Sequence, residues 1–590
     1  MAEKRRRIVI LGGGFAGVYA AKYLIHELRR AGVADVETAL VSRENYLTFQ
    51  PLLPEVIAGG VDTLHTISPI RRIVPGAAVY VRGIDAIDLE QQVVRLEAGY
   101  SRRKLDLEYD HLVLALGNRL ATGMVPGLAE HAVPFKYLGD ALRLRHHLVH
   151  VLEEAAIARD PEERNRLLTI VVAGGGFSGV ECIAEMHDFL RLAIRSYPGI
   201  GPEELKIVLL QSGETILPEM KPSLAGFAHK VLVRRGIQIE VNTRMTAVTA
   251  TAAVTKDKAT GETRIIPTRT VVATVPTEPH PLLAGLAIPQ QGGKILVTNE
   301  LHSAAASNVW AIGDCAAVPL LKEGFAPPTA QHAVRQGKLC AHNIVASLSG
   351  KPLAPYQFES LGSLASLGRR SAVAEVMGIK LSGFLAWLMW RGVYLSKFPG
   401  WERKIRLLVD WLCDLVLPRD VTQLRIFQPP SVRREHFEAG EAIFLKEDLG
   451  DRVYFVVKGE ADIEIDGRVV NTVTTGDVVG EIALISHRPR TATVRAKTAL
   501  DVVSVTRDTF DTLVSHFPGV KGTMHQIMER HLGTPAADAR PLEGSTSGSL
   551  PLVGRAGEGG SPADGDSTGN SSPLPNPPHQ GEGTRGVVGV

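Results

Sequence analysis

The chain has 590 residues, with 65 lysines and arginines against 63 aspartates and glutamates. Its length predicts roughly three or four domains. The balanced charge gives no indication of a nucleic-acid partner, and we expect none. The four cysteines lie far apart without a CxxC pair, which argues against a redox-active dithiol and against a metal cluster. No apolar run reaches the length of a membrane-spanning helix, so any membrane contact is expected from one side.

The first motif is a glycine-rich loop after a short apolar run. Residues 8–11, Ile-Val-Ile-Leu, lead into Gly12-Gly13-Gly14-Phe15-Ala16-Gly17 and then into a helical stretch. Gly12 suits the tight turn, Gly14 lets the backbone approach a pyrophosphate, and Gly17 lets the helix pack close to the strand. The motif predicts phosphates at the helix N-terminus, although a lone GxGxxG also occurs as a purely structural turn.

The same pattern recurs 162 residues later. Residues 168–173 lead into Gly174-Gly175-Gly176-Phe177-Ser178-Gly179 and a helix that carries Glu181. Two dinucleotide folds in one chain predict two nucleotides held face to face, with electron transfer between them.

A third motif completes the first fold. Residues 308–312 read as a strand that ends in Gly313-Asp314, which places a carboxylate beside the first ligand. Together with the strand in 109–117, this predicts that the first domain is discontinuous and that the second is inserted into it.

With the segments 45–55 and 327–331, these motifs make residues 6–420 resemble a type II NADH dehydrogenase. This family consists of single-subunit, non-pumping, FAD-dependent NAD(P)H:quinone oxidoreductases of respiratory membranes. The resemblance implies FAD on the first fold and NADH or NADPH on the second. Hydride would pass to the flavin and electrons to a quinone. The cofactor-binding residues that it implies are Gly12, Gly14, Gly17, Ser42, Pro51, Gly313, Asp314 and Ala330 for FAD, and Gly174, Gly176, Gly179 and Gln211 for NAD(P)H.

Three catalytic candidates follow from the resemblance. Glu181 is expected near the nicotinamide and the flavin, as an orienting or proton-handling group, or else as a first-turn glutamate favoured by the helix dipole. Gln331 is expected at the quinone. Arg335 stands where the family commonly has a second glutamine, with Gln336 directly after it. An arginine there would still hydrogen-bond a quinone carbonyl and favour developing negative charge.

Two positions lack the acidic residue that usually binds a ribose hydroxyl. Ser42 ends the second strand of the first fold, and Gln211 follows the corresponding strand of the second. A neutral glutamine does not repel a 2′-phosphate, so NADPH is not excluded.

Residues 381–420 carry four of the chain's five tryptophans, interrupted by basic residues. Tryptophans and cations on short helices are typical of an interfacial membrane anchor, although core or dimer-interface helices also fit. We expect the protein to be a homodimer bound peripherally to the cytoplasmic face of the cell membrane.

From about residue 424 the chain changes to short alternating strands separated by glycine turns, which predicts a small antiparallel barrel or jelly roll. Its spacing resembles a cyclic nucleotide-binding domain. The phosphate cassette of that family matches Gly480-Glu481-Ile482-Ala483-Leu484 and Pro489-Arg490-Thr491-Ala492-Thr493. By this resemblance Glu481 accepts from the ribose 2′-hydroxyl and Arg490 pairs with the cyclic phosphate. Gly480, Ala483 and Thr491 complete the site for cAMP or cGMP.

The predicted fold class is α/β with two Rossmann-like domains, the second inserted in the first, followed by amphipathic helices and a β jelly roll. The predicted boundaries are 6–130 with 290–350 for FAD, 131–289 for NAD(P)H, 351–423 for the anchor region, 424–530 for the cyclic nucleotide-binding domain and 534–590 for a disordered tail. Two other functions stay open at this point. They are a soluble flavin reductase of a small redox protein and a non-catalytic nucleotide sensor.

Overall fold

The computed structural model describes residues 6–98, 104–275, 277–320, 324–358, 360–417, 419–422, 431–448, 450–486 and 489–516. The predicted tail, 534–590, lies outside the described residues, as do both ends of the predicted module 424–530.

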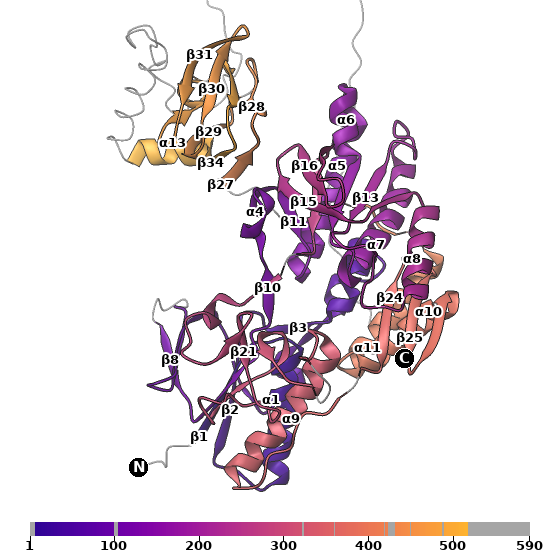
Figure 1. Cartoon of the computed structure of the whole chain (residues 1–590), viewed down its shortest axis with the longest axis vertical. Helices are drawn as coiled ribbons and strands as arrows, with labels where there is room; N and C mark the ends of the chain where they lie inside the picture. The colour runs from indigo at the N-terminus through magenta and orange to yellow at the C-terminus, as the bar shows by residue number, and fades with distance from the viewer. Residues whose placement is uncertain are drawn as a thin grey trace, which may run out of the picture. The chain divides into compact units, whose positions relative to one another are not determined.

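The first domain is built on a five-stranded parallel sheet in the order β22-β9-β1-β2-β5. Its strands are β1 (Arg6–Leu11), β2 (Val36–Ser42), β5 (Ala78–Val81), β9 (His111–Leu114) and β22 (Val309–Ala311). Helices α1 (Phe15–Arg30) and α9 (Ala330–Leu348) pack side by side (Figure 1). Because β22 comes after the second fold in the sequence yet pairs with β9, the first domain is discontinuous, as predicted.

Smaller elements complete this domain. They are β3 (Tyr46–Thr48), α2 (Leu53–Ile57), β4 (Ile67–Pro69), α3 (Ile70–Ile73), β6 (Ile84–Asp88), β7 (Val93–Leu96), β8 (Leu105–Glu108), β20 (Gln290–Gln291), β21 (Lys294–Leu296) and β23 (Ala316–Ala317).

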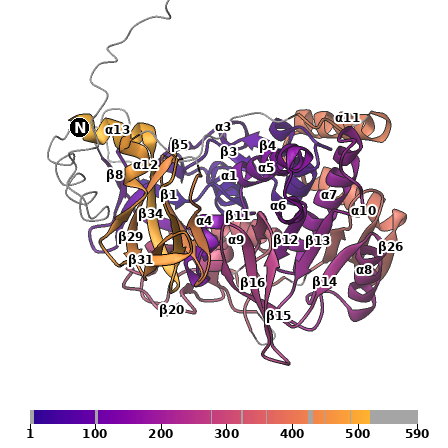
Figure 2. The same cartoon turned by 90° about the horizontal axis from the view of Figure 1, so that it is seen from above.

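The inserted domain has a second five-stranded parallel sheet, in the order β11-β18-β12-β13-β14. Its strands are β11 (Ala132–Pro134), β12 (Thr169–Ala173), β13 (Lys206–Leu210), β14 (Ile237–Glu240) and β18 (Thr270–Ala273). Every residue of β12 is buried, because a parallel sheet is covered on both faces. The helices are α4 (Leu128–His131), α5 (Leu138–Ile157), α6 (Pro161–Leu167), α7 (Phe177–Ala193) and α8 (Pro222–Arg234). Figure 2 shows α7 and α8 beside β13 and β14.

An antiparallel meander extends this domain, and a short strand pair links it to the first. The meander consists of β15 (Thr243–Val248), β16 (Ala252–Asp257) and β17 (Thr263–Pro267). The linking pair is β10 (Asn118–Leu120) with β19 (Thr277–Pro279).

The next region adds a three-stranded antiparallel sheet before its two helices. These elements are β24 (Gly362–Ser366), β25 (Ala372–Val376), β26 (Ile379–Gly383), α10 (Phe384–Lys397) and α11 (Trp401–Val416). Within the part of the chain that the structure describes, no helix is both long and apolar enough to cross a membrane.

The last described module consists of two four-stranded antiparallel sheets, in the orders β27-β34-β29-β32 and β28-β33-β30-β31. Its elements are β27 (Val432–Phe437), β28 (Ala442–Phe444), β29 (Arg452–Lys458), β30 (Ala461–Ile465), β31 (Arg468–Val473), β32 (Val478–Val479), α12 (Glu481–Ser486), β33 (Thr493–Ala496), β34 (Leu500–Thr506) and α13 (Arg507–His516). The predicted antiparallel jelly roll is confirmed.

Candidate functional site

The first glycine loop has the geometry of a phosphate cradle. Gly12 adopts φ +119°, and a Cβ there would overlap the carbonyl oxygen of Ala115. A Cβ at Gly17 would in turn overlap the carbonyl of Gly12, so α1 packs directly on the loop. No atom lies within 4 Å of the Cβ position of Gly14, which is the N-cap of α1 and makes no side-chain capping bond. This open helix N-terminus fits the diphosphate of FAD.

Two polar side chains lie close to this loop. Ser42 ends β2 and is so near the loop that a Cβ at Gly13 would overlap its hydroxyl. Asp314 lies in the short turn Gly313–Cys315, where burial raises the pKa of its carboxyl and the ammonium of Lys136 opposes that rise. Lys136 comes from the other domain and was not foreseen, because no local pattern relates residue 136 to residue 314.

The remaining first-domain candidates lie on the segments that surround the loop. Pro51 is in the turn Gln50–Leu52, and Ala330 is the first residue of α9. The backbone N–H of Gly313 donates to Oε1 of Gln336 at 2.7 Å. Gln336, which is buried, therefore holds the Gly313-Asp314 turn, a role that the sequence did not assign to it.

The second glycine loop repeats the geometry of the first. Gly174 has φ +114°, and Gly179 packs against the carbonyl of Gly174. At Gly176, the N-cap of α7, the nearest atom to a Cβ position is Oε1 of Glu219, 4.0 Å away. The open N-terminus of α7 fits the pyrophosphate of a nicotinamide nucleotide.

Gln211 directly follows β13 and is bonded to this loop. Its Oε1 accepts from the N–H of Gly175 at 3.1 Å, and its Nε2 donates to the carbonyl of Thr215 at 3.0 Å. A neutral amide therefore stands where related folds often place a carboxylate.

Glu181 is a buried acid one turn into α7. Its Oε1 accepts from the backbone N–H of Ser366 at 2.8 Å and from Nε1 of Trp390 at 3.2 Å. Burial raises the pKa of Glu181 to about 8, the two hydrogen bonds act against this rise, and the charges of Glu185 and Glu55 add to it. Glu181 is thus a side chain that can hold a proton at neutral pH.

Gln331 and Arg335 lie in the first two turns of α9. Nε2 of Gln331 donates to the carbonyl of Gly362 at 2.9 Å. The guanidinium of Arg335 donates to the carbonyl of Gln331 at 3.0 Å and lies 3.7 Å from the ring centroid of Phe358. It faces a cavity of about 600 Å³ that is lined mainly from α1 and α9.

Strand β24 connects two of the three catalytic candidates. Glu181 binds its last residue, Ser366, and Gln331 binds its first, Gly362. The two contacts are four residues apart, roughly 13 Å along an extended strand. The same strand therefore orients both side chains, whereas Arg335 makes its contacts on α9 and at Phe358.

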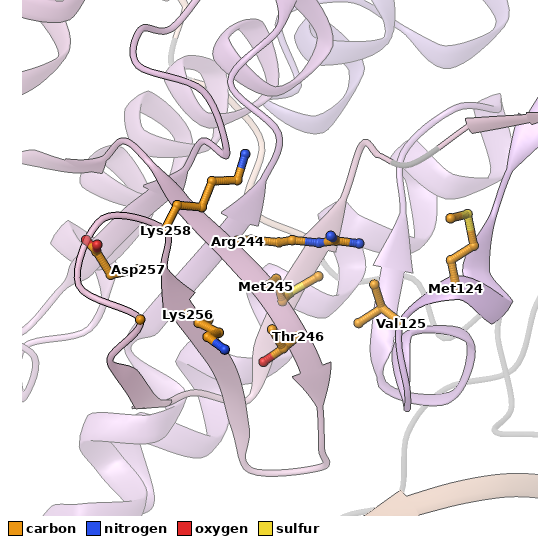
Figure 3. A pocket seen from close by; sticks show the side chains of 9 residues that line it. Met124, Val125, Arg244, Met245, Thr246, Lys256, Asp257 and Lys258 are labelled. Carbon is orange, nitrogen blue, oxygen red and sulfur yellow. The ribbon is translucent and has the colours of Figure 1, made fainter.

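A further cavity, of about 550 Å³, lies on the meander of the inserted domain (Figure 3). Side chains from β15, β16 and the segment at Met124 line it, and they include Arg244, Met245 and Lys256. No predicted site residue lines this cavity.

The phosphate cassette of the last module has an inward-pointing arginine. Arg490 is 2% exposed and donates to the carbonyls of Gly480 and Arg452, each at 2.7 Å. Its guanidinium lies 4.1 Å from the ring centroid of Phe444, and no described residue accepts a hydrogen bond from its Nε. No described carboxylate lies within ion-pair distance of Arg490, although the charges of Asp451, Asp448 and Glu481 act on it from further away. A buried cation whose Nε has no described acceptor fits an anionic ligand.

The other cassette residues surround this arginine. Gly480 has φ +86°, and a Cβ there would overlap the guanidinium of Arg490. Glu481 begins α12 and is buried, as is Ala483. Thr491 is exposed.

Three family models match the chain. Residues 6–337 match the pyridine nucleotide-disulphide oxidoreductases, residues 360–420 match the NDH2 C-terminal domain, and residues 434–517 match the cyclic nucleotide-binding domain.

Curated relatives match about 70% of the chain. The demethylphylloquinone reductase NdbB of Synechocystis is 34% identical over 415 residues, which cover 70% of this chain and 97% of that protein. The type II NADH:quinone oxidoreductase Ndh of Mycobacterium tuberculosis is 32% identical over 430 residues, which cover 70% and 89%. The structure of NDH2 from Plasmodium falciparum in complex with NADH has a TM-score of 0.65 at 20% identity, covering 71% of this chain and 100% of that one. The last likeness establishes the fold alone.

Proposed function

This chain belongs to the type II NADH:quinone oxidoreductase family, and on that premise we propose that it is a membrane-associated FAD enzyme that passes electrons from NADH or NADPH to a quinone under the control of a cyclic nucleotide. The family membership agrees with the resemblance that the motifs indicated. As that resemblance implies, the reaction proceeds without proton pumping.

The observation that carries the redox part of this proposal is the position of Glu181, a buried acid on the helix whose N-terminus forms the second glycine loop. When bound, FAD accepts the hydride of NAD(P)H and supplies the electrons for the quinone. The open N-termini of α1 and α7 would hold the two pyrophosphates, and Ser42 and Asp314 would offer polar contacts to the flavin nucleotide. Gln331 and Arg335 remain the proposed quinone contacts.

The net reaction, NADH + H⁺ + quinone → NAD⁺ + quinol, takes up one proton. A carboxyl group whose pKa lies near physiological pH is suited to deliver a proton inside a protein. Glu181 meets this condition because burial raises the pKa of its carboxyl to about 8, so that it keeps its proton at neutral pH.

The membrane part rests on α10 and α11. Large apolar side chains are exposed on these helices, namely Phe384, Leu385, Leu388, Trp401, Ile405, Leu408, Val409, Leu412, Leu415 and Val416. Basic residues alternate with them, including Lys397, Arg403 and Lys404. An exposed apolar face with cations at its edge suits the interface of an anionic bilayer. We assign it to the cytoplasmic face of the cell membrane, where a lipid-soluble quinone is accessible.

The regulatory part rests on Arg490. A buried guanidinium that forms no close ion pair with a described carboxylate is suited to a cyclic phosphate, with Glu481 at the ribose. The ligand is cAMP or cGMP.

We also propose that the protein is a homodimer. Light scattering on the purified protein in detergent measures its mass and tests this.

Steady-state oxidation of NADH and NADPH in vesicles that contain a quinone analogue tests this function, with and without cAMP and cGMP. We expect quinone-dependent turnover, vesicle association and a change in rate with one of the nucleotides. Equal turnover with a small redox protein in the absence of lipid would favour a soluble reductase. Bound flavin that neither nicotinamide reduces would favour a non-catalytic sensor.

A further inference from the structure

Five buried ionisable side chains meet where α2, α7, α10 and α11 come together. We call Glu55, Glu185, Arg391, Asp414 and Arg419 the buried ion cluster. Each of these side chains is at most 10% exposed. None of the five was singled out by the sequence motifs, because they come from four separate stretches of the chain.

Acids and cations alternate through the cluster. The guanidinium of Arg391 lies 3.2 Å from Glu55 and 3.8 Å from Asp414. The guanidinium of Arg419 lies 2.7 Å from Asp414 and 3.2 Å from Glu185. Nε1 of Trp411 also donates to Glu55 at 2.7 Å. The cluster therefore runs from Glu55 to Glu185 as one chain of ion pairs.

The cluster extends to Glu181 through two helices. Glu185 follows Glu181 by four residues on α7, so both side chains lie on the same helix face. On α10, Trp390 donates to Glu181, and the next residue, Arg391, donates to Glu55. Two of the helices that hold the cluster, α7 and α10, thus also hold Glu181.

The charges of this region are unequal. Glu181 and the three cluster acids make four carboxyls, against two guanidiniums that stay charged at every relevant pH. The two guanidiniums contact Glu55, Asp414 and Glu185, and no described guanidinium forms an ion pair with Glu181. Because an unpaired buried charge is strongly unfavourable, Glu181 is the carboxyl that stays neutral.

The other titratable groups around Glu181 do not change this result. Tyr394 on α10 is neutral, since burial raises the pKa of its hydroxyl. Asp188, further along α7, is paired with Arg235. Ser366 on β24 supplies only a backbone N–H.

We propose that the buried ion cluster is a positioning network for the proposed reaction: its Glu185 end holds a negative charge one helical turn from Glu181, so that Glu181 keeps the proton that quinone reduction consumes. Burial raises the pKa of Glu185 to about 7, and Arg419 opposes this rise and favours the ionised form. Arg391 acts in the same way on Glu55, whose pKa burial also raises. The cluster residues touch neither reactant. This inference rests on the proposed function.

The test is an infrared titration of neutral carboxyl groups in the FAD-loaded enzyme, alongside the pH dependence of quinone reduction. Glu181→Gln identifies the band of Glu181. In Glu185→Gln a like charge is lost, so the Glu181 band should disappear at a pH lower by about one unit or more. The alkaline limb of kcat/KM for the quinone should shift by the same amount. The control is Glu162→Gln, an exposed glutamate on α6, which should leave both unchanged.

A second pair of variants keeps the test decisive if Glu185→Gln does not fold. Arg419→Gln should add a second neutral carboxyl at neutral pH, because Glu185 loses its cation, and Arg419→Lys should restore the wild-type titration. If these variants reduce quinone and the titration of Glu181 does not shift in them, the network is overturned and the proposed function stays intact. A titration that shifts as expected in an enzyme that reduces no quinone would overturn the proposed function, and with it the role of the network.

Discussion

At the scale of single residues, environment decides what Glu181 does. The residue stands in the first turns of a helix, where a glutamate is favoured for its interaction with the helix dipole alone. The contacts that distinguish it come from Ser366 and Trp390, which are 185 and 209 residues away in the sequence. The sequence could therefore nominate Glu181 from its family motif, but it could not show its burial or its hydrogen-bond donors.

The raised pKa of Glu181 makes the stability of the protein depend on pH. Burial raises this pKa from 4.5 to about 8, so between these values the folded state keeps a proton that the unfolded state loses. The stabilisation is full below the lower value and is lost as the pH rises to the upper one. Relative to Glu181→Gln, the free energy of unfolding of the wild type should fall by a few kcal/mol across this window, at about 1.4 kcal/mol per pKa unit. Urea unfolding of the FAD-loaded proteins measures the difference, and parallel stability curves would refute it.

Gln211 offers a prediction on the choice of nucleotide. Gln211→Glu keeps the shape of the side chain but places a carboxylate at the end of β13. That carboxylate accepts from the ribose hydroxyls of NADH and repels the 2′-phosphate of NADPH. We expect kcat/KM for NADPH to fall at least about tenfold relative to NADH. The measurement is steady-state kinetics with each nucleotide, and an unchanged ratio would show that Gln211 does not face the ribose.

Arg490 offers a prediction on the cyclic nucleotide. Arg490→Ala removes the cation of the cassette, so the affinity for cAMP or cGMP should fall by about 100-fold or more. Arg490→Lys keeps the charge but not the bidentate geometry of the guanidinium. Its affinity should lie between those of the wild type and of Arg490→Ala. Isothermal titration calorimetry measures both variants, and Arg468→Ala, an exposed position on β31, serves as the control. Wild-type affinity in a folded Arg490→Ala protein would refute the assignment.

At the scale of elements, the motif-bearing segments could be predicted and the supporting ones could not. Both glycine loops join a strand to a helix as expected, because an apolar run, GxGxxG and a helical stretch are local signals. The sheet of β24, β25 and β26 was missed within the predicted anchor region 351–423. Its short strands contain few periodic apolar residues, and its fold depends on packing against α7, α8 and α10. This sheet orients Glu181 and Gln331, so the omission concerned the site itself.

Helix α11 provides the prediction on membrane binding. Leu408 and Leu412 are both exposed and lie one turn apart on the same face. Leu408→Glu with Leu412→Glu should weaken binding to anionic vesicles by at least about tenfold, because two carboxylates replace the apolar surface that would enter the bilayer and repel the headgroups. Flavin content should not change. Ile157→Glu on α5, which is 73% exposed, is the control in vesicle sedimentation. Unaltered sedimentation would assign this face to a protein interface instead.

At the scale of the whole molecule, the sequence predicted the order of the parts because two motifs of the same kind are separated by 162 residues and the first sheet is completed later by the strand before Gly313. The pairing of β22 with β9 follows from that arrangement. The buried ion cluster could not be predicted in the same way. Its members are spread from Glu55 to Arg419, and only the assembled fold brings their charges together.

The central claim is that NAD(P)H reduces a flavin in this chain and that a quinone reoxidises it. An anaerobic double-mixing experiment on the purified FAD-loaded protein in lipid vesicles measures this directly, by following flavin absorbance first with NADH and then with a quinone analogue. The account predicts bleaching on the first mix and full recovery of the oxidised spectrum on the second. A flavin that stays oxidised with both NADH and NADPH, or that stays reduced in the presence of excess quinone, would contradict it.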